Sequence, residues 1–167
     1  MAIDRRLELE RLVRAHQRGV WRYLRYLGAA NAEADDLTQE TFLAVWKQPF
    51  DDYDQRATAA YLRQVAKNKF LMHLRAKGRR PEVNLDAAER EFAAFARDDS
   101  GEGHIAALTD CMQGLQGKAR QVVDVYYVQG HSRAAAATLM QMTEEGVKTL
   151  LRRVKDSLRE CVERKLK

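Results

Sequence analysis

The chain has few of the residues that shape small or irregular proteins: 2 cysteines, 2 prolines and 9 glycines among 167 residues. Cys111 and Cys161 have no second cysteine pair and no histidines at ligand spacing, so the sequence indicates neither a zinc site nor a disulfide framework. We expect two separate thiols, in the core or at the surface. No cofactor, metal ligand or catalytic residue is expected.

Long apolar runs are also missing. No stretch approaches the roughly 18 residues needed to span a bilayer, and residues 1–12 are charged and amphipathic without a signal-peptide core. The sequence therefore predicts a cytoplasmic protein with no membrane insertion.

The residues that dominate the chain are helix formers. Hydrophobic residues make up 46% and charged residues 32% of the sequence, and leucine, alanine, arginine and glutamate fill long periodic stretches. This composition predicts an all-α fold. The length suits one average domain or two small ones.

Charge divides the chain into three blocks. Residues 1–80 carry a net charge of +6, residues 81–110 carry −6 and residues 111–167 carry +5. Two basic modules around an acidic connector suggest two contacts with a polyanion. We predict two small helical domains, at 1–80 and 105–167, joined by a flexible acidic linker at 81–104 with one short helix near 87–96.

Helical periodicity in the first module predicts helices at 4–27, 32–47 and 58–79. In the second of these, Leu37, Phe42, Val45 and Trp46 would face inward, with Asp35, Asp36, Gln39 and Glu40 facing out. The carboxylates suggest a metal or acid–base site, but no histidine or third carboxylate lies at helical spacing to complete it. An acidic face beside aromatic residues is better suited to docking a basic partner.

The third predicted helix is strongly basic. Residues 56–80 hold eight lysines and arginines and no acid, while Leu62, Ala66 and Phe70 keep helical register. Such a folded basic face attracts phosphates. Asn68 adds a group able to read a base edge, and the ring of Tyr61 is able to stack on a base.

The last third predicts a helix-turn-helix. Ser132 would cap a short alanine-rich helix ending at Met140, and Thr143, followed by two glutamates, would cap a second, longer helix. One side of that helix is an apolar stripe of Val147, Leu150, Leu151, Val154, Leu158 and Val162. The opposite side presents groups that pair with phosphates and with base edges in the major groove, namely Lys148, Thr149, Arg152, Arg153 and Lys155.

Taken in order, these stretches resemble the bacterial sigma factors of the extracytoplasmic-function (ECF) group of the sigma-70 family. Residues 35–47, with their acidic start followed by Gln39-Glu40, look like the family's polymerase-docking signature. Residues 61–68 and 75–80 are similar to the segment that opens and reads the −10 promoter element. Residues 115–123 and 127–132, with Val147-Lys148-Thr149 and Arg153 behind them, look like the module for the −35 element.

The resemblance implies a role for each set of residues. Core RNA polymerase would be bound by Asp35, Asp36, Gln39, Glu40, Phe42 and Trp46. The −10 element would meet Tyr61, Arg63, Lys67, Asn68, Arg75, Lys77, Arg79 and Arg80, with a flipped base held by Asn68 and the loop at 50–60. The −35 duplex would meet Arg120, Ser132, Thr143, Lys148, Thr149, Arg152, Arg153 and Lys155.

The resemblance also implies partners: core RNA polymerase, promoter DNA and an inhibitory anti-sigma protein, with no small-molecule substrate. The chain would not be an enzyme, because the polymerase supplies the chemistry. This sequence departs from the family at several positions. Gln141 stands where the family usually has glycine, and Tyr61 stands where it usually has tryptophan.

Two other interpretations remain open from the residues alone. A free-standing helix-turn-helix regulator would bind an operator through the second module, but it has no need of eight unopposed positive charges in the first. A small helical enzyme would use Asp35, Asp36 and Glu40 with His73 or His104, but the histidines are scattered.

Overall fold

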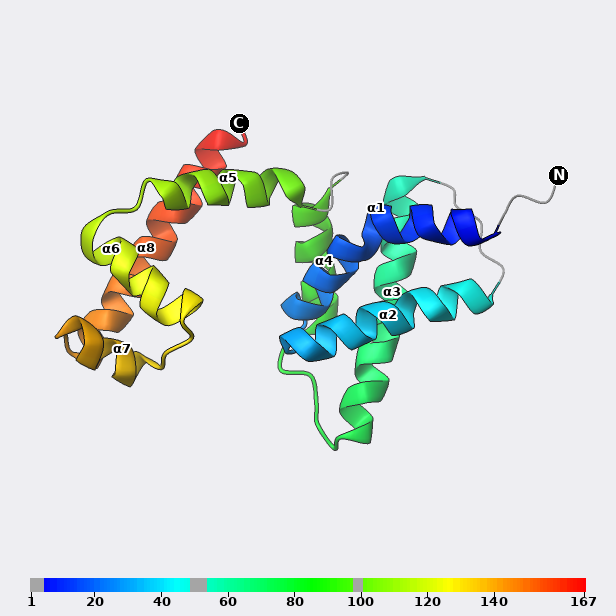
Figure 1. The fold of residues 1–167 in the computed structure, drawn as a ribbon, viewed down its shortest axis with the longest axis horizontal. Coiled ribbons are helices and arrows are strands. Elements are labelled where there is room, and N and C mark those ends of the chain that lie inside the picture. Colours follow the sequence, from blue (N-terminus) through cyan, green and yellow to red (C-terminus); the bar gives the residue numbers. More distant parts are fainter. Residues whose placement is uncertain (1–4, 49–53, 98–100) are drawn as a thin grey trace. The chain divides into compact units, whose positions relative to one another are not determined.

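The computed structural model describes residues 5–48, 54–97 and 101–167, which form eight α-helices and one π-helical segment without any strand (Figure 1). This confirms the all-α fold class. The helices form two compact units, residues 1–101 and 102–167, each with its own apolar core.

Three long helices build the first unit: α1 (Arg5–Tyr26), α2 (Asn31–Lys47) and α3 (Gln55–Ala76). Their apolar stripes meet in one core whose fully buried members include Leu24, Leu37 and Leu62. The helices expected at 4–27 and 32–47 form nearly as predicted within the described residues.

The third helix begins earlier than predicted, at Gln55 instead of residue 58. Asp54 is its N-cap, because the carboxylate accepts a hydrogen bond from the backbone N–H of Ala57 at 2.8 Å. Residues 55–60 are therefore helical and do not belong to the predicted base-holding loop, and residues 50–53 of that loop lie outside the described part of the chain.

Helix α3 ends in a left-handed glycine turn. Gly78 has φ +65°, and the N–H of Arg79 reaches back to the carbonyl of Leu74 at 2.8 Å. A side chain at a positive φ is strained, so glycine suits this position. The turn sends Arg79 back toward the start of α2.

The short helix expected inside the linker forms as α4 (Leu85–Ala96), capped by Asn84. It differs from a linker element because Ala88, Phe92 and Ala96 are buried in the core of the first unit. Phe92 packs against Tyr23, with ring centroids 5.2 Å apart. The apolar residues at 88, 92 and 96 give α4 one hydrophobic face. This face packs against the first unit, so α4 is part of that unit and not of a linker.

The second unit contains α5 (Glu102–Gln113), α6 (Gly117–Val123), the π-helical η1 (Asp124–Val128), α7 (Arg133–Met140) and α8 (Glu144–Lys165). Its core joins Val122, Ala136, Val147 and Leu151 from α6, α7 and α8. The predicted stripe along the last helix is confirmed at Val147, Leu151 and Val154, which are buried.

Cys111 and Cys161 form a disulfide that joins α5 to α8. The expectation of two separate thiols was wrong. The cysteines lie 50 residues apart in the sequence, but the packing of α5 on α8 brings their Cα atoms to 6.1 Å. Spacing along the chain does not report this proximity, which arises only from tertiary packing.

Candidate nucleic-acid interface

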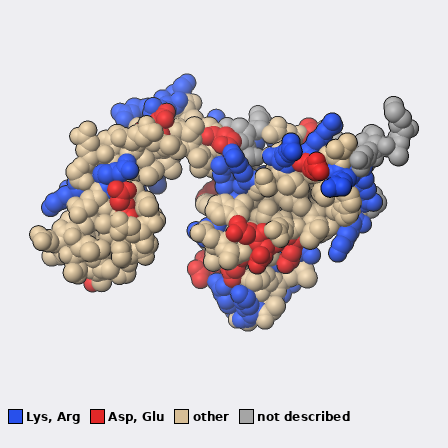
Figure 2. All heavy atoms as spheres, in the orientation of Figure 1, with Lys and Arg blue, Asp and Glu red and all other residues tan. Residues whose placement is uncertain are grey.

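An acidic surface lies on α2 of the first unit (Figure 2). Asp36, Gln39 and Glu40 are exposed on one face of the helix, as predicted from their spacing. Leu43 continues the same face one turn later and is 55% exposed. An exposed leucine beside carboxylates fits a protein-binding surface, in which an apolar centre is ringed by polar groups. The same spacing rule applied to Leu43 would have found it from the sequence.

The other residues predicted for this surface are engaged within the unit. Phe42 is buried in the core, as the inward side of the helix requires. Asp35 accepts a hydrogen bond from the indole Nε1 of Trp21 at 2.7 Å. The guanidinium of Arg5 lies 5.4 Å from the ring centre of Trp46. These contacts extend the α2 surface onto α1.

A basic surface lies on α3 and the turn after it, below the acidic patch in Figure 2. Asn68, Arg75, Lys77, Arg79 and Arg80 are exposed, and Lys67 is half-buried. Tyr61 is 37% exposed near the start of the helix. Seven of the eight residues predicted for the −10 element therefore lie at the surface of one element and its terminal turn.

Glu33, at the start of α2, binds the basic end of α3. Its carboxylate contacts Nε2 of His73 at 3.0 Å, Nζ of Lys77 at 3.4 Å and Nη1 of Arg79 at 3.3 Å. It also accepts the backbone N–H of Ala30 at 3.0 Å. The bond from Ala30 is the largest cause, and the bond to His73 the next, of a pKa lowered to about 2. The role of Glu33 could not be predicted from the sequence, because nothing local links it to residues that lie 40 or more positions away.

Arg63 differs from the prediction. It is 7% exposed and its Nε donates to the carboxylate of Glu89 on α4 at 2.9 Å. Its guanidinium also lies 5.9 Å from the ring centre of Phe92. Helical spacing explains why Arg63 is buried, because it places Arg63 on the apolar side of α3 together with Ala66 and Phe70.

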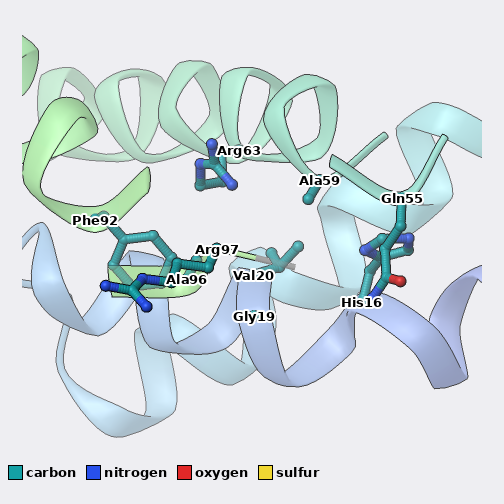
Figure 3. Close-up of a pocket in the computed structure, with 9 residues that line it drawn as sticks. All are labelled: His16, Gly19, Val20, Gln55, Ala59, Arg63, Phe92, Ala96 and Arg97. Carbon is teal, nitrogen blue, oxygen red and sulfur yellow. The ribbon is translucent and has the colours of Figure 1, made fainter. Parts of the chain in front are cut away.

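Figure 3 shows Arg63 with residues of α1 and α4 around a cavity of about 20 Å³. Its lining includes His16, Val20, Phe92 and Ala96. A space of this size accepts about one water molecule, so it is not a pocket for a substrate or a nucleotide base. The arrangement keeps Arg63 from the surface on which the other residues predicted to contact DNA lie.

The predicted helix-turn-helix of the second unit is confirmed in its local geometry. The hydroxyl of Ser132 accepts the N–H of Ala135 at 3.1 Å, and that of Thr143 accepts the N–H of Gly146 at 3.0 Å. Between the two helices Gln141 has φ 53° and ψ 46°, which is left-handed. The caps and the turn fix where α8 begins, and therefore which of its side chains face outward.

Basic residues predicted for the −35 duplex lie on the outer side of α8. Lys148, Arg152, Arg153 and Lys155 are exposed, and Thr149 is half-buried. Arg120 lies outside this set, on α6, where its Nε pairs with Asp124 at 3.2 Å.

Two shallow grooves flank these residues. One, of about 460 Å³, is lined by Lys148, Arg152 and Lys155 together with Tyr126, Tyr127 and Arg133. The other, of about 450 Å³, is lined by Lys118, Thr149 and Arg153 among others. Tyr127 and Arg133 come from neighbouring elements, so only the folded unit shows that they border α8.

No group of three or more histidine, cysteine or acidic side chains is arranged to hold a metal ion in the described part of the chain. Within the same part, none of the helices has the length and apolar character needed to cross a bilayer.

A helical body with an acidic face and a basic face, together with a second body built on a helix-turn-helix, defines a DNA-binding protein of transcription. Residues 12–80 match the family Sigma-70 region 2, and residues 105–158 match Sigma-70, region 4. The chain belongs to the sigma-70 family of RNA polymerase sigma factors, in its ECF group.

Similar proteins include the ECF RNA polymerase sigma factor BldN of Streptomyces coelicolor, which is 34% identical over 78% of this chain and 51% of the relative. The chain thus matches about half the length of that protein. The ECF RNA polymerase sigma factor SigM of Bacillus subtilis is 23% identical over 92% of this chain and 94% of the relative. Among solved structures, the RsbN-BldN complex matches with 26% identity and a TM-score of 0.32, covering 91% of this chain and 89% of that chain.

Proposed function

We propose that this chain binds core RNA polymerase through α2 and directs initiation at promoters that carry paired −35 and −10 elements. One observation supports the proposal. The region 2 unit exposes an acidic face and a basic helix end, and the region 4 unit exposes a basic recognition helix. The chain makes and breaks no covalent bond in this function. It supplies position and strand separation, and the polymerase supplies the chemistry.

The docking contact rests on Asp36, Gln39, Glu40 and Leu43. Their exposure on one helix face supports a contact with a basic surface that also has an apolar pocket. Asp35 and Trp46 would act at the edge of this surface, since both are held by side chains of α1.

The −10 contact rests on the second half of α3 and the turn after it, where Asn68, Arg75 and Arg80 are exposed and Lys67 is half-buried. Cations there would neutralise phosphates, and Asn68 would hydrogen-bond to an unstacked base. Lys77 and Arg79 would also contact DNA, with their side chains oriented by ion pairs with Glu33.

The −35 contact rests on α8. Lys148, Thr149 and Arg152 would enter or border the major groove, with phosphate contacts from Arg153 and Lys155. The anti-sigma protein expected from the resemblance would cover the same exposed faces of α2 and α8. By covering both faces, it would block the binding of polymerase and of promoter DNA at the same time.

The first test mixes the purified chain with bacterial core polymerase and maps transcription starts on genomic DNA. Stable association and initiation from sites that share two upstream elements are expected. A chain that binds DNA as a dimer and leaves core polymerase unbound would instead be a free-standing regulator.

A second test separates the docking face from general charge effects. Asp36→Arg with Glu40→Arg should weaken polymerase binding at least tenfold and leave the circular dichroism spectrum unchanged. Glu82→Arg with Asp86→Arg makes the same change in net charge away from α2, and should bind polymerase like the unmodified chain. Equal losses in both pairs would contradict a specific role for α2.

A third test counts phosphate contacts on α8. Arg152→Ala with Arg153→Ala should flatten the salt dependence of duplex binding by about two units of slope. Arg159→Ala with Arg164→Ala removes two exposed arginines farther along the same helix and should leave the slope nearly unchanged. An unchanged slope in the first pair would remove both arginines from the interface.

A further inference from the structure

The disulfide of the second unit lies at the far end of α8 from its DNA-facing residues. Cys161 stands six residues beyond Lys155, which is roughly 9 Å along a helix. The proposed duplex contacts are therefore complete without it. The bond instead fastens α5 to the end of the recognition helix.

Helix α5 has a small apolar contact with the rest of its unit. Its buried residues are Ala107 and Cys111, and both side chains are small. The main core of the unit draws its buried residues from α6, η1, α7 and α8, and from α5 only Met112 packs against it, half-buried. Burial therefore holds α5 less firmly than the helices that form the core.

Two polar contacts join α5 to its surroundings at exposed positions. Nζ of Lys165 lies 3.7 Å from the carboxylate of Asp110, and Nη1 of Arg120 donates to the carbonyl of Met112 at 3.3 Å. Ion pairs at the surface contribute little to stability. The Cys111–Cys161 bond is thus the strongest link between the two helices, and it closes a 50-residue separation. Long closures restrict the unfolded chain most.

We propose that Cys111 and Cys161 form a reversible dithiol–disulfide site, oxidised by hydroperoxides, that sets the stability of the unit bearing the helix-turn-helix. The oxidation and reduction of the two sulfurs do not depend on the proposed function. Their consequence for promoter binding rests on the proposed function.

Exposure assigns the order of the steps. Cys161 is half-buried and Cys111 is buried, so the Cys161 thiolate meets hydrogen peroxide first. Its sulfur attacks one peroxide oxygen, the O–O bond breaks, and the departing hydroxide takes up a proton as water, which leaves a sulfenic acid. The Cys111 sulfur then attacks the sulfenic sulfur, the S–O bond breaks and a second water leaves. Two thiols lose two electrons and two protons to one peroxide, and a dithiol reductant reverses the bond by exchange.

The test uses the full chain, first reduced with dithiothreitol and desalted, then exposed to hydrogen peroxide or to buffer. Thiols are counted by the mass shift after maleimide labelling, and unfolding is followed by circular dichroism. Peroxide should remove both thiols together without forming covalent dimers, and should raise the melting temperature of the second unit by about 10 °C or more. Oxidation confined to one cysteine, covalent dimers, or equal melting temperatures in the two states would overturn the proposal.

Two variants provide the controls. Cys161→Ser and Cys111→Ala should each melt like the reduced chain, with or without peroxide. A peroxide-dependent rise in melting temperature in either variant would also overturn the proposal, because the bond would not be its cause.

Duplex binding distinguishes this proposal from the proposed function. At low temperature both redox states should bind a −35 duplex with similar affinity. Near the melting temperature of the reduced state, the oxidised chain alone should retain binding. Absence of promoter binding in both states would count against the proposed function and leave the thiol and melting results as they stand, whereas loss of low-temperature binding on reduction would overturn the separation of the bond from the DNA face.

Discussion

Glu33 shows how one residue organises a surface at the residue scale. It meets His73, Lys77 and Arg79 at the end of α3, and the N–H that begins α2. The end of an otherwise acid-free run of cations thus receives a fixed counter-charge, delivered from another helix. The position of Lys77 and Arg79 depends on that charge.

Glu33→Gln should lower the free energy of unfolding of the first unit by about 1 kcal/mol at pH 7. Glutamine keeps the bond to Ala30 and loses the charge that attracts the cations. The folded-state pKa near 2 lies below the ordinary 4.5, so the charge stabilises fully above pH 4.5 and the benefit is lost as the pH falls toward 2. Urea titrations at pH 7, 4 and 3 should therefore show the difference between the two proteins shrinking.

Glu10→Gln is the matched control for this change. Glu10 forms an exposed pair with Arg6 one turn away on α1, 3.8 Å apart, and removal of the pair should change stability by a few tenths of a kcal/mol. Equal effects of the two substitutions would mean that the Glu33 cluster contributes no more than an ordinary surface pair.

The left-handed backbone conformation of Gln141, at the turn of the helix-turn-helix, is unfavourable for a residue with a side chain. A non-glycine residue at φ 53° is disfavoured, and glycine relieves the strain. Gln141→Gly should raise the free energy of unfolding of the second unit by about 0.5–1 kcal/mol. Gln129→Gly is the comparison, because Gln129 has φ −85°, and the same change there should lower stability or leave it unchanged. Thermal melts of both variants check the sign.

At the scale of elements, sequence periodicity and capping residues predicted the helices well and their docking poorly. Ser132, Thr143 and the apolar stripe of α8 act within a few residues, so local pattern was enough. The packing of Phe92 on Tyr23 buries α4 against α1, and Arg63 pairs with Glu89, 26 residues away. Both contacts arise between helices that are separated in sequence. The pairing of Cys111 with Cys161 has the same origin. In the candidate site, exposure of the acidic and basic faces followed from spacing, whereas the contacts of Glu33 required the fold.

Phe92→Ala should detach α4. Phe92 is 4% exposed and contacts Tyr23 and Arg63, so its removal is expected to cost about 3–4 kcal/mol. Limited proteolysis should then cut within residues 85–97 much faster than in the unmodified chain. Phe95→Ala, at a half-buried position on the same helix, should cost less and accelerate cleavage less. Equal protection in all three proteins would show that α4 is held by other contacts.

At the scale of the whole molecule, two separate cores predict two unfolding steps. The first core contains Leu62 and the second contains Val147, and both side chains are fully buried. Leu62→Ala should lower only the step of the first unit, by about 2–5 kcal/mol, and Val147→Ala only that of the second, by a smaller amount. Calorimetry of the full chain measures both steps. A single transition that either substitution shifts would contradict independent units.

The ion pair between Arg63 and Glu89 should constrain which substitutions are tolerated at these two positions. A lone change of sign at either position leaves an unmatched charge beside the aromatic ring of Phe92, whereas simultaneous exchange restores the pair. Descendants of this chain should therefore alter positions 63 and 89 in concert, and an alignment of its orthologues should record the two as a coevolving couple.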